Sequence, residues 1–314
     1  MVEARNESWF ADCFQKNSPG VMPGDHPARG IFTRHGLVDS RGRAGYRINF
    51  IGEKVFITDG PWRSDSGGVF PWSDEAELIL GYLKDHLEED RFSAVVDPAC
   101  GCGHTPIAFG GSLHRFAFDK NPRSAEFVRI NAKMNDCVAT YGTRDIVQGF
   151  SEEQIRDFGK RPLFVINMPF ALSPYVGALP SASEGGPDGL VLTRHALNAC
   201  QRADRWTAVV LTYTLCDRDL SRWDILEEAR RWCGSATLRW ELLSDAPMWR
   251  INGKKEQPNP MPLGEGLPKK ADCRLSVRNS DRERVRTCYQ RLAARLEARG
   301  WYFLGQGILL VEQN

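Results

Sequence analysis

The sequence predicts an α/β fold with a doubly wound, mainly parallel sheet, preceded by a small extension that contains β structure. Three observations predict it. From Ser73 onward, apolar runs of strand length alternate with segments of helical periodicity, which is the order that β-α-β units produce. One apolar run enters a glycine-rich turn, "FSAVVDPACGCG", as happens at the carboxyl edge of such sheets. The composition, 42% hydrophobic and 26% charged, is that of an ordinary globular domain.

The first 72 residues differ in character from the rest. "YRINFIGEKVFITDG" reads as two short strands around a glycine-containing turn, which predicts a hairpin. The stretches on either side are rich in glycine, proline and arginine and predict loops. We therefore expect residues 1–72 to be an N-terminal extension that covers the substrate site, and residues 73–314 to be the main domain.

The main domain opens with a helix over "SDEAELILGYLKDHLEED", whose Ala76, Leu80, Leu83 and Leu87 recur at helical spacing. Strands are predicted at "FSAVV", "HRFAFD", "PLFVI" and "WTAVVLTYTL". Helices are predicted between and after them at "PRSAEFVRINAKMND", "GLVLTRHALNACQ" and "LSRWDILEEARRWCG". This alternation predicts helices on both faces of the sheet.

A proline-, glycine- and lysine-rich stretch near residues 245–271 is predicted to be a loop insertion. After it we expect a strand near "CRLSVR" and a final strand at "GILLVEQ". The helix expected between them has apolar residues on one face, namely Val285, Cys288, Leu292 and Leu296.

Several function classes are disfavoured by bulk properties. The formal net charge of the 314 residues is +1, which gives no general attraction to nucleic acid or membranes. No apolar run approaches the ~20 residues that cross a bilayer, and the charged start "MVEARNESWF" does not read as a signal peptide. The nine cysteines are scattered without a C-x-x-C pair, which predicts reduced thiols in a cytoplasmic protein.

A metal site is not expected. Cys100, Cys102 and His104 have C-x-C-x-H spacing within a glycine turn. Structural zinc sites instead use C-x₂₋₄-C spacing. We interpret these residues as small loop residues.

The turn after the first main-domain strand carries the predicted cofactor site. Asp97, Ala99, Gly101 and Gly103 place an acid and small residues where backbone can approach a ligand closely. A dinucleotide fingerprint would need a third glycine at Pro106, which argues against nicotinamide or flavin. The D-x-A-x-G-x-G turn instead resembles the cofactor loop of class I S-adenosylmethionine (SAM) methyltransferases, with Ala99 in place of the first glycine. This resemblance implies a Rossmann-like seven-stranded sheet and SAM as cofactor.

The next strand ends in Asp119, about 20 residues downstream, where a nucleotide-binding unit carries its ribose acid. Asn121 and Pro122 already supply an N-cap and a first helical residue, so Asp119 is expected to be free for ribose hydroxyls. Lys120 beside it is included in the expected cofactor site. Asp145, further along, is expected to accept from the adenine amino group.

The stretch "LFVINMPF" is the predicted reaction site, because a buried strand ends there in an amide, a proline and an aromatic ring. It resembles the Asn-Pro-Pro-Tyr/Phe motif of methyltransferases that act on amino or amide nitrogens. The resemblance implies that the Asn167 side chain and the next backbone carbonyl accept hydrogen bonds from the acceptor and aim its lone pair at the methyl carbon. It also implies that Phe170 packs against the acceptor and that Pro169 belongs to the same catalytic motif. Positioning of this kind supplies most of the catalysis in an in-line methyl transfer.

Two further stretches resemble release-factor glutamine methyltransferases, so that the likeness covers residues 69 to about 200. "GVFPWSDEAELI" resembles their segment before the SAM loop. "SASEGGPDGLVLTRHAL" resembles their G-G-x-D-G-L segment, matched at Gly185, Gly186, Asp188, Gly189 and Leu190. Trp72 and Met168 replace an arginine and a proline of that family. The N-terminal hairpin and the 245–271 insertion lack a counterpart there, which argues against a protein glutamine substrate.

A sulfur acceptor would explain the relaxed motif, because a thioether has no proton to remove. Aromatic faces stabilise the sulfonium that forms, and the candidate rings are Trp62, Trp72, Phe170 and Tyr213. For an amino-acid carboxylate the candidates are Arg34, Arg63 and Arg250, of which Arg250 is retained. The chain is similar in size and layout to bacterial methionine S-methyltransferases. That resemblance implies a small amino-acid acceptor, with the thioether of L-methionine as the specific hypothesis.

Two alternatives remain at this level. One is an N-methyltransferase acting on a protein amide, a small amine or a nucleobase. A nucleic-acid partner is disfavoured, since the lysine pairs at 254–255 and 269–270 are thin support for a basic footprint. The other is a non-catalytic SAM-binding subunit. Oligomeric state is left open between a monomer and a homodimer, and no membrane partner is expected.

Overall fold

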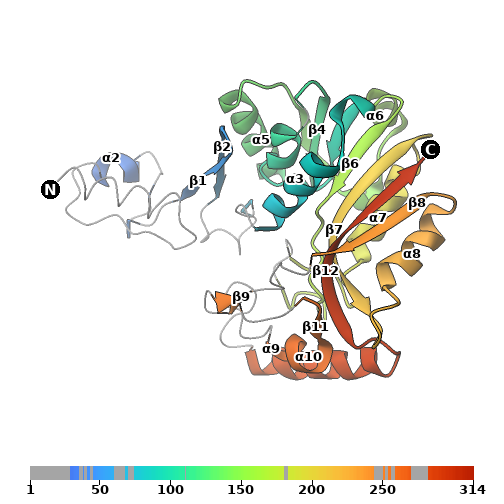
Figure 1. Ribbon diagram of the computed structural model, residues 1–314. Coiled ribbons are helices and arrows are strands. Elements are labelled where there is room, and N and C mark those ends of the chain that lie inside the picture. Colours follow the sequence, from blue (N-terminus) through green and yellow to red (C-terminus); the bar gives the residue numbers. More distant parts are fainter. Residues whose placement is uncertain are drawn as a thin grey trace. The chain divides into compact units, whose positions relative to one another are not determined.

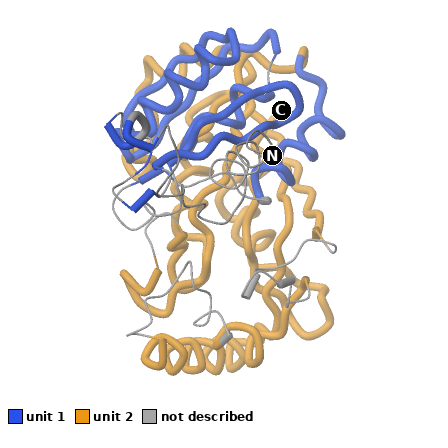
Figure 2. Tube along the Cα trace, turned by 90° about the vertical axis from the view of Figure 1, so that its left-hand side faces the viewer, with its two compact units in different colours: residues 1–89, 100–144 blue, residues 90–99, 145–314 orange. Residues whose placement is uncertain are grey.

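The computed structural model describes residues 29–34, 38, 41–42, 45–59, 68–69, 74–109, 111–179, 183–243, 250–251, 254–255, 259–269 and 282–314. The chain divides into two compact units, shown in different colours in Figure 2. Unit 1 comprises residues 1–89 and 100–144, and unit 2 comprises residues 90–99 and 145–314. The predicted boundary at residue 72 stays a prediction.

Unit 1 contains the hairpin and the elements around the glycine turn (Figure 1). In chain order they are α2 (Arg29–Arg34), β1 (Tyr46–Ile51), β2 (Lys54–Asp59), α3 (Asp74–His86), α4 (His104–Ala108), β4 (His114–Asp119), α5 (Pro122–Met134) and β5 (Thr140–Thr143). A short 3-10 helix, η2 (Glu89–Arg91), follows α3. The apolar face predicted for α3 is confirmed, since Ala76, Leu80, Leu83 and Leu87 are all buried.

Unit 2 contains most of the sheet (Figure 1). Its elements are β3 (Ala94–Asp97), η3 (Ile146–Gln148), α6 (Glu152–Asp157), β6 (Pro162–Ile166), α7 (Val191–Cys200), β7 (Trp206–Cys216), α8 (Asp224–Cys233), β8 (Thr237–Leu242), β9 (Arg250–Ile251), β10 (Lys254–Lys255), β11 (Met261–Pro262), α9 (Leu263–Lys269), α10 (Arg282–Glu297) and β12 (Phe303–Gln313). Every residue of β3, β6 and β7 is buried. Strands buried on both faces are typical of a parallel sheet covered on both sides.

The strand order of the eight-stranded sheet is β11-β12-β7-β6-β3-β4-β5, with β8 also paired to β12. The pairs β4–β5, β3–β6 and β6–β7 are parallel, whereas β12 is antiparallel to β7, β8 and β11. The predicted doubly wound α/β class is therefore confirmed.

The N-terminal hairpin is also confirmed. β1 and β2 pair antiparallel from Tyr46 opposite Asp59 to Ile51 opposite Lys54. Gly52 in the turn has a φ of 58°, a left-handed conformation that favours glycine. Its role as a substrate-site cover stays a prediction.

The insertion differs from the prediction. Within 245–271, α9 replaces part of the expected loop, because its Leu263 and Leu267 are buried at helical spacing. The strand expected near "CRLSVR" lies outside the described residues. Strand β8 was not predicted, although "TLRWEL" alternates between exposed and half-buried positions as an edge strand does. Within the described ranges, no helix is long and apolar enough to cross a membrane.

Candidate functional site

The glycine turn after β3 is bound to the carboxylate at the end of β4. The backbone N–H of Gly101 donates to Asp119 Oδ2 at 2.9 Å. The N–H of Asn121 donates to Asp119 Oδ1 at 2.8 Å. A single aspartate therefore holds the glycine turn on one side and the start of α5 on the other.

Asp119 is consequently not free in the way the sequence suggested, because each oxygen already accepts one backbone N–H. A carboxylate oxygen can accept two hydrogen bonds, so capacity for a ligand hydroxyl remains. Burial raises the pKa of the Asp119 carboxyl, and the hydrogen bonds from Asn121 and Gly101 oppose that shift. The predicted N-cap is confirmed, since the Asn121 side chain accepts from Arg123 N and Pro122 opens α5.

Gly103 shows why the turn requires glycine. Its φ is 79°, and a Cβ at this position would lie 2.9 Å from the Val128 side chain on α5. A larger residue would push the turn away from α5. Gly101, with a φ of 53°, is also left-handed.

The remaining residues of the predicted cofactor site have local partners or are exposed. Asp97 is 2% exposed and accepts from Ala99 N at 3.0 Å, which shapes the start of the turn. Lys120 is exposed. Asp145 caps η3 by accepting from Val147 N at 3.1 Å. A contact between Asp145 and adenine stays a prediction.

The amide of Asn167 lies at the carboxyl edge of three parallel strands in unit 2. β3 and β6 pair in parallel with Val96 opposite Phe164, so Asp97 and Asn167 follow neighbouring strands at the same edge. Asn167 is half-buried, and its side chain makes no hydrogen bond to any residue that the structure describes. A half-buried amide without a partner can accept from, and donate to, a bound molecule.

An aromatic pair follows this amide. The rings of Phe170 and Tyr213 have centroids 4.6 Å apart and planes at 68°, an edge-to-face contact. Tyr213 is 4% exposed on β7, while Phe170 is half-buried. Met168, the residue that replaces proline in the resembled motif, is 3% exposed. The structure thus brings three predicted site residues, Asn167, Phe170 and Tyr213, to one end of unit 2.

The glycine segment 185–189 supports this turn from behind. A Cβ at Gly185 would lie 2.6 Å from Phe170 Cα, and one at Gly189 would lie 2.6 Å from the Phe170 carbonyl oxygen. The glycines of the resembled G-G-x-D-G-L segment are therefore needed for close packing against the Phe170 backbone. Asp188 accepts from Leu190 N at 2.9 Å and pairs with Arg194, which is a structural role.

Four of the candidate substrate residues cannot be placed. Trp62 and Trp72 lie outside the described residues, as does Arg63. Arg250 belongs to β9, but its side chain is not described. Pro169 is half-buried between Met168 and Phe170. Arg34 ends α2 and is exposed.

Sequence reasoning missed Tyr289 on α10. Its hydroxyl donates to the carbonyl oxygen of Leu172 at 2.8 Å, and the residue is fully buried. It belongs to an apolar cluster that includes Leu172, Tyr213 and Leu292, against which Phe170 packs. A tyrosine within the helical repeat was the available signal, since a buried tyrosine hydroxyl needs a partner.

The cysteine and histidine residues of the glycine turn form a local contact. Cys102 Sγ lies 3.5 Å from His104 Nδ1. Burial lowers the pKa of His104 to about 4, so the imidazole is neutral near pH 7. Among the residues that the structure describes, no three His, Cys, Asp or Glu side chains are grouped to hold a metal ion.

Comparison with known proteins gives only distant likenesses. No family model matches the chain, and no curated protein matches it. Among solved structures, M. jannaschii TYW2 in complex with AdoMet is 11% identical with a TM-score of 0.44, covering 85% of this chain and 87% of that one. A complex of aTrm5 with tRNALeu is 12% identical with a TM-score of 0.46, covering 86% of this chain and 53% of that one. The [4+2]-cyclase SpnF is 11% identical with a TM-score of 0.41, covering 81% of this chain and 91% of that one. These likenesses are too weak to assign a cofactor, substrate or partner.

Proposed function

We propose that this chain is a SAM-dependent methyltransferase whose acceptor is a small amino-acid-like molecule. The observation that carries the proposal is the bond from the Gly101 N–H to the Asp119 carboxylate. It joins the D-x-A-x-G-x-G turn to the strand-end acid, which are the two parts expected to hold a nucleoside. The position where a pyrophosphate-binding loop needs its third glycine is the buried Pro106 in α4, which favours a ligand without a pyrophosphate.

Asn167 supports a transfer reaction at the same carboxyl edge as Asp97. In this proposal Asp119 takes the ribose, and Asn167 orients the acceptor. A SAM-binding subunit without activity would not require a half-buried amide without a described partner at a strand end. Such a group would contribute to catalysis by orienting the acceptor, because methyl transfer needs in-line approach of the acceptor lone pair.

For the acceptor, we propose the thioether of L-methionine. The acceptor sulfur attacks the methyl carbon of SAM, the S–CH₃ bond of SAM breaks, and its electron pair returns to the cofactor sulfur. The products are neutral S-adenosylhomocysteine and S-methylmethionine, whose new sulfonium carries the positive charge. No proton leaves, so no general base is required.

The aromatic pair Phe170–Tyr213 supports this choice, because ring faces stabilise a cation that lacks hydrogen-bond donors. Met168 also supports it. Proline would fix the φ of that residue and hold its carbonyl toward an amino group, whereas a thioether has no N–H for that carbonyl to accept.

The test is to incubate the protein with SAM and methionine, norleucine or a primary amine, and to identify products by mass spectrometry between pH 7 and pH 9. We expect a sulfonium product from methionine at a nearly constant rate, and no methylated norleucine. An amine acceptor would instead show a rate that rises with pH up to its own pKa. Methylated norleucine, or a product from the amine alone, would refute the sulfur acceptor while leaving methyl transfer intact.

A further inference from the structure

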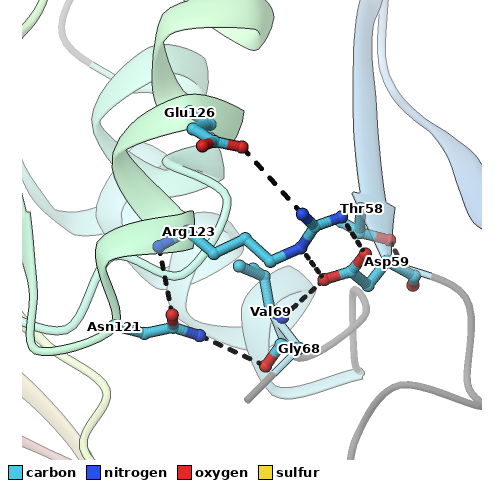
Figure 3. Close-up of polar contacts among 7 residues, drawn as sticks. All are labelled: Thr58, Asp59, Gly68, Val69, Asn121, Arg123 and Glu126. Carbon is cyan, nitrogen blue, oxygen red and sulfur yellow. Dashed lines mark hydrogen bonds and ion pairs between the residues drawn. The ribbon is translucent and has the colours of Figure 1, made fainter. Parts of the chain in front are cut away.

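A fully buried carboxylate ends the N-terminal hairpin. Asp59, the last residue of β2, is 0% exposed. Arg123 donates to it twice, from Nε to Oδ2 and from Nη2 to Oδ1, both at 2.7 Å (Figure 3). The backbone N–H of Val69 also donates to Oδ2, at 2.8 Å. Such a two-bonded Arg–carboxylate pair is among the strongest polar contacts in proteins.

The pair ties Gly68 and Val69 to the start of α5. Arg123 is the second residue of that helix, and the preceding cap residue Asn121 donates from Nδ2 to the Gly68 carbonyl at 3.4 Å (Figure 3). The N–H of the same Asn121 is held by Asp119. Residues 68–69 are therefore linked through Asn121 to Asp119, the proposed ribose acid.

The Val69 side chain reaches the glycine turn itself. It is 2% exposed and forms an apolar cluster with Cys102 and Phe127. A Cβ at Gly101 would lie 3.8 Å from Val69 Cγ1, which is ordinary van der Waals contact. Val69 thus packs on the turn whose Gly101 N–H bonds to Asp119.

We infer that Asp59 and Arg123 are positioning residues for the cofactor. They hold Gly68–Val69 against the glycine turn, which keeps the Gly101 N–H on Asp119 before SAM arrives. Preorganisation of this kind raises affinity by reducing the ordering cost of binding. The inference rests on the proposed function, since it assigns the pair to the SAM site.

A second attachment of the same hairpin provides the control. Asn135, at the far end of α5, donates from Nδ2 to the Val55 carbonyl at 2.7 Å and accepts from Val55 N at 2.9 Å. Asn135→Ala therefore loosens the start of β2, whereas Arg123→Gln loosens its end. Only the second change reaches Gly68–Val69.

The experiment compares SAM dissociation constants by calorimetry, and kcat at saturating SAM, for the full chain and its variants. For Arg123→Gln we expect the SAM Kd to rise about tenfold, as for one lost charge-assisted bond, with kcat within about twofold of wild type. For Asn135→Ala we expect Kd within about twofold of wild type. Arg123→Lys, which keeps the charge, should recover part of the lost affinity.

Removing Arg123 leaves the buried Asp59 carboxylate without its cation, which destabilises proteins strongly. If Arg123→Gln does not fold, Val69→Ala decides instead. It leaves the ion pair intact and should raise Kd several-fold by removing the contact with the glycine turn. An unchanged Kd in a folded Arg123→Gln or in Val69→Ala, or an equal rise in Asn135→Ala, would overturn the inference. A wild-type chain that binds no SAM would overturn the proposed function itself.

Discussion

Asn167 directly follows β6. Its side chain has no hydrogen-bond partner among the described residues, so its removal should cost the fold little. We predict that Asn167→Ala lowers kcat at least ~10²-fold, the scale of lost positioning. The SAM Kd should stay nearly unchanged. Parallel calorimetry and turnover measurements check this. Equal losses of binding and turnover would instead give Asn167 a structural role.

Substitution of Asp119 should have the opposite effect to that of Asn167, since it should weaken SAM binding itself. Asp119→Ala is predicted to weaken SAM binding by about 2 kcal/mol, as for lost charge-assisted hydrogen bonds. Asp85→Ala, which removes an exposed aspartate near the end of α3, serves as the matched control and should bind SAM normally. Identical SAM affinity in Asp119→Ala and wild type would remove Asp119 from the cofactor site.

The pH dependence of wild-type binding follows from the same residue. Burial raises the pKa of the Asp119 carboxyl. Its contribution to folding stability is therefore fully present below the ordinary aspartate pKa and is lost as pH rises through the raised pKa, because ionising the buried carboxyl is costly. Ribose hydroxyls donate best to the ionised form. As pH is lowered, SAM affinity should fall when Asp119 becomes protonated. Because its pKa is raised, this fall should come at a higher pH than for an aspartate with an ordinary pKa. Titrations at a series of pH values measure this, and Asp119→Ala should lack that step.

Sequence reasoning reached residues whose role follows from a local pattern. Asp119 was predicted as the ribose acid because it ends a strand about 20 residues after Asp97. The structure shows it holding the Gly101 and Asn121 N–H groups, and its contact with ribose stays a prediction. Asp59 and Arg123 were not found, because their partnership joins positions far apart in the chain. Asn131 on α5 and the C-cap residue Asn135, four positions later, were a usable signal that this side of the helix meets polar backbone, since both bond to β2.

At the scale of elements, α10 fixes the segment that follows the Asn167–Phe170 turn. Tyr289→Phe removes the donor to the Leu172 carbonyl and leaves that buried oxygen short of a partner. We predict a loss of about 1–2 kcal/mol in the free energy of unfolding. Tyr141→Phe, at 38% exposure, is the control and should change stability by much less. Urea unfolding measures both, and equal effects would mean that the Leu172 contact contributes nothing specific.

Elements with a strong local pattern were predicted well. The apolar run of β7 predicts a buried strand, and the spaced leucines of α3 predict a helix, each from the pattern within one segment. α9 was missed because proline and glycine in "PMPLGEGLPKK" suggested a loop. Burial of Leu263 and Leu267 in the cluster with Tyr289 outweighs that weak propensity.

For the whole molecule, the alternation of strands and helices was sufficient to predict the sheet class. The position of β12 was not predictable, because it pairs with β7 and β8 through contacts distant in sequence. The 245–271 insertion carries β11 and α9, and α10 follows it before β12. β11 pairs with the start of β12, opposite Leu304 and Phe303. No local pattern specifies such long-range pairing.

The most direct measurement follows the methyl group of labelled SAM. The wild-type chain and Asn167→Ala are incubated with labelled SAM and a panel of methionine, small amines, a release factor and DNA, and the label is traced by mass. The account predicts label in a small-molecule product, with methionine as the acceptor, and at least ~10²-fold less in Asn167→Ala. SAM that binds but transfers no methyl to any acceptor, or SAM that does not bind at all, would contradict the account.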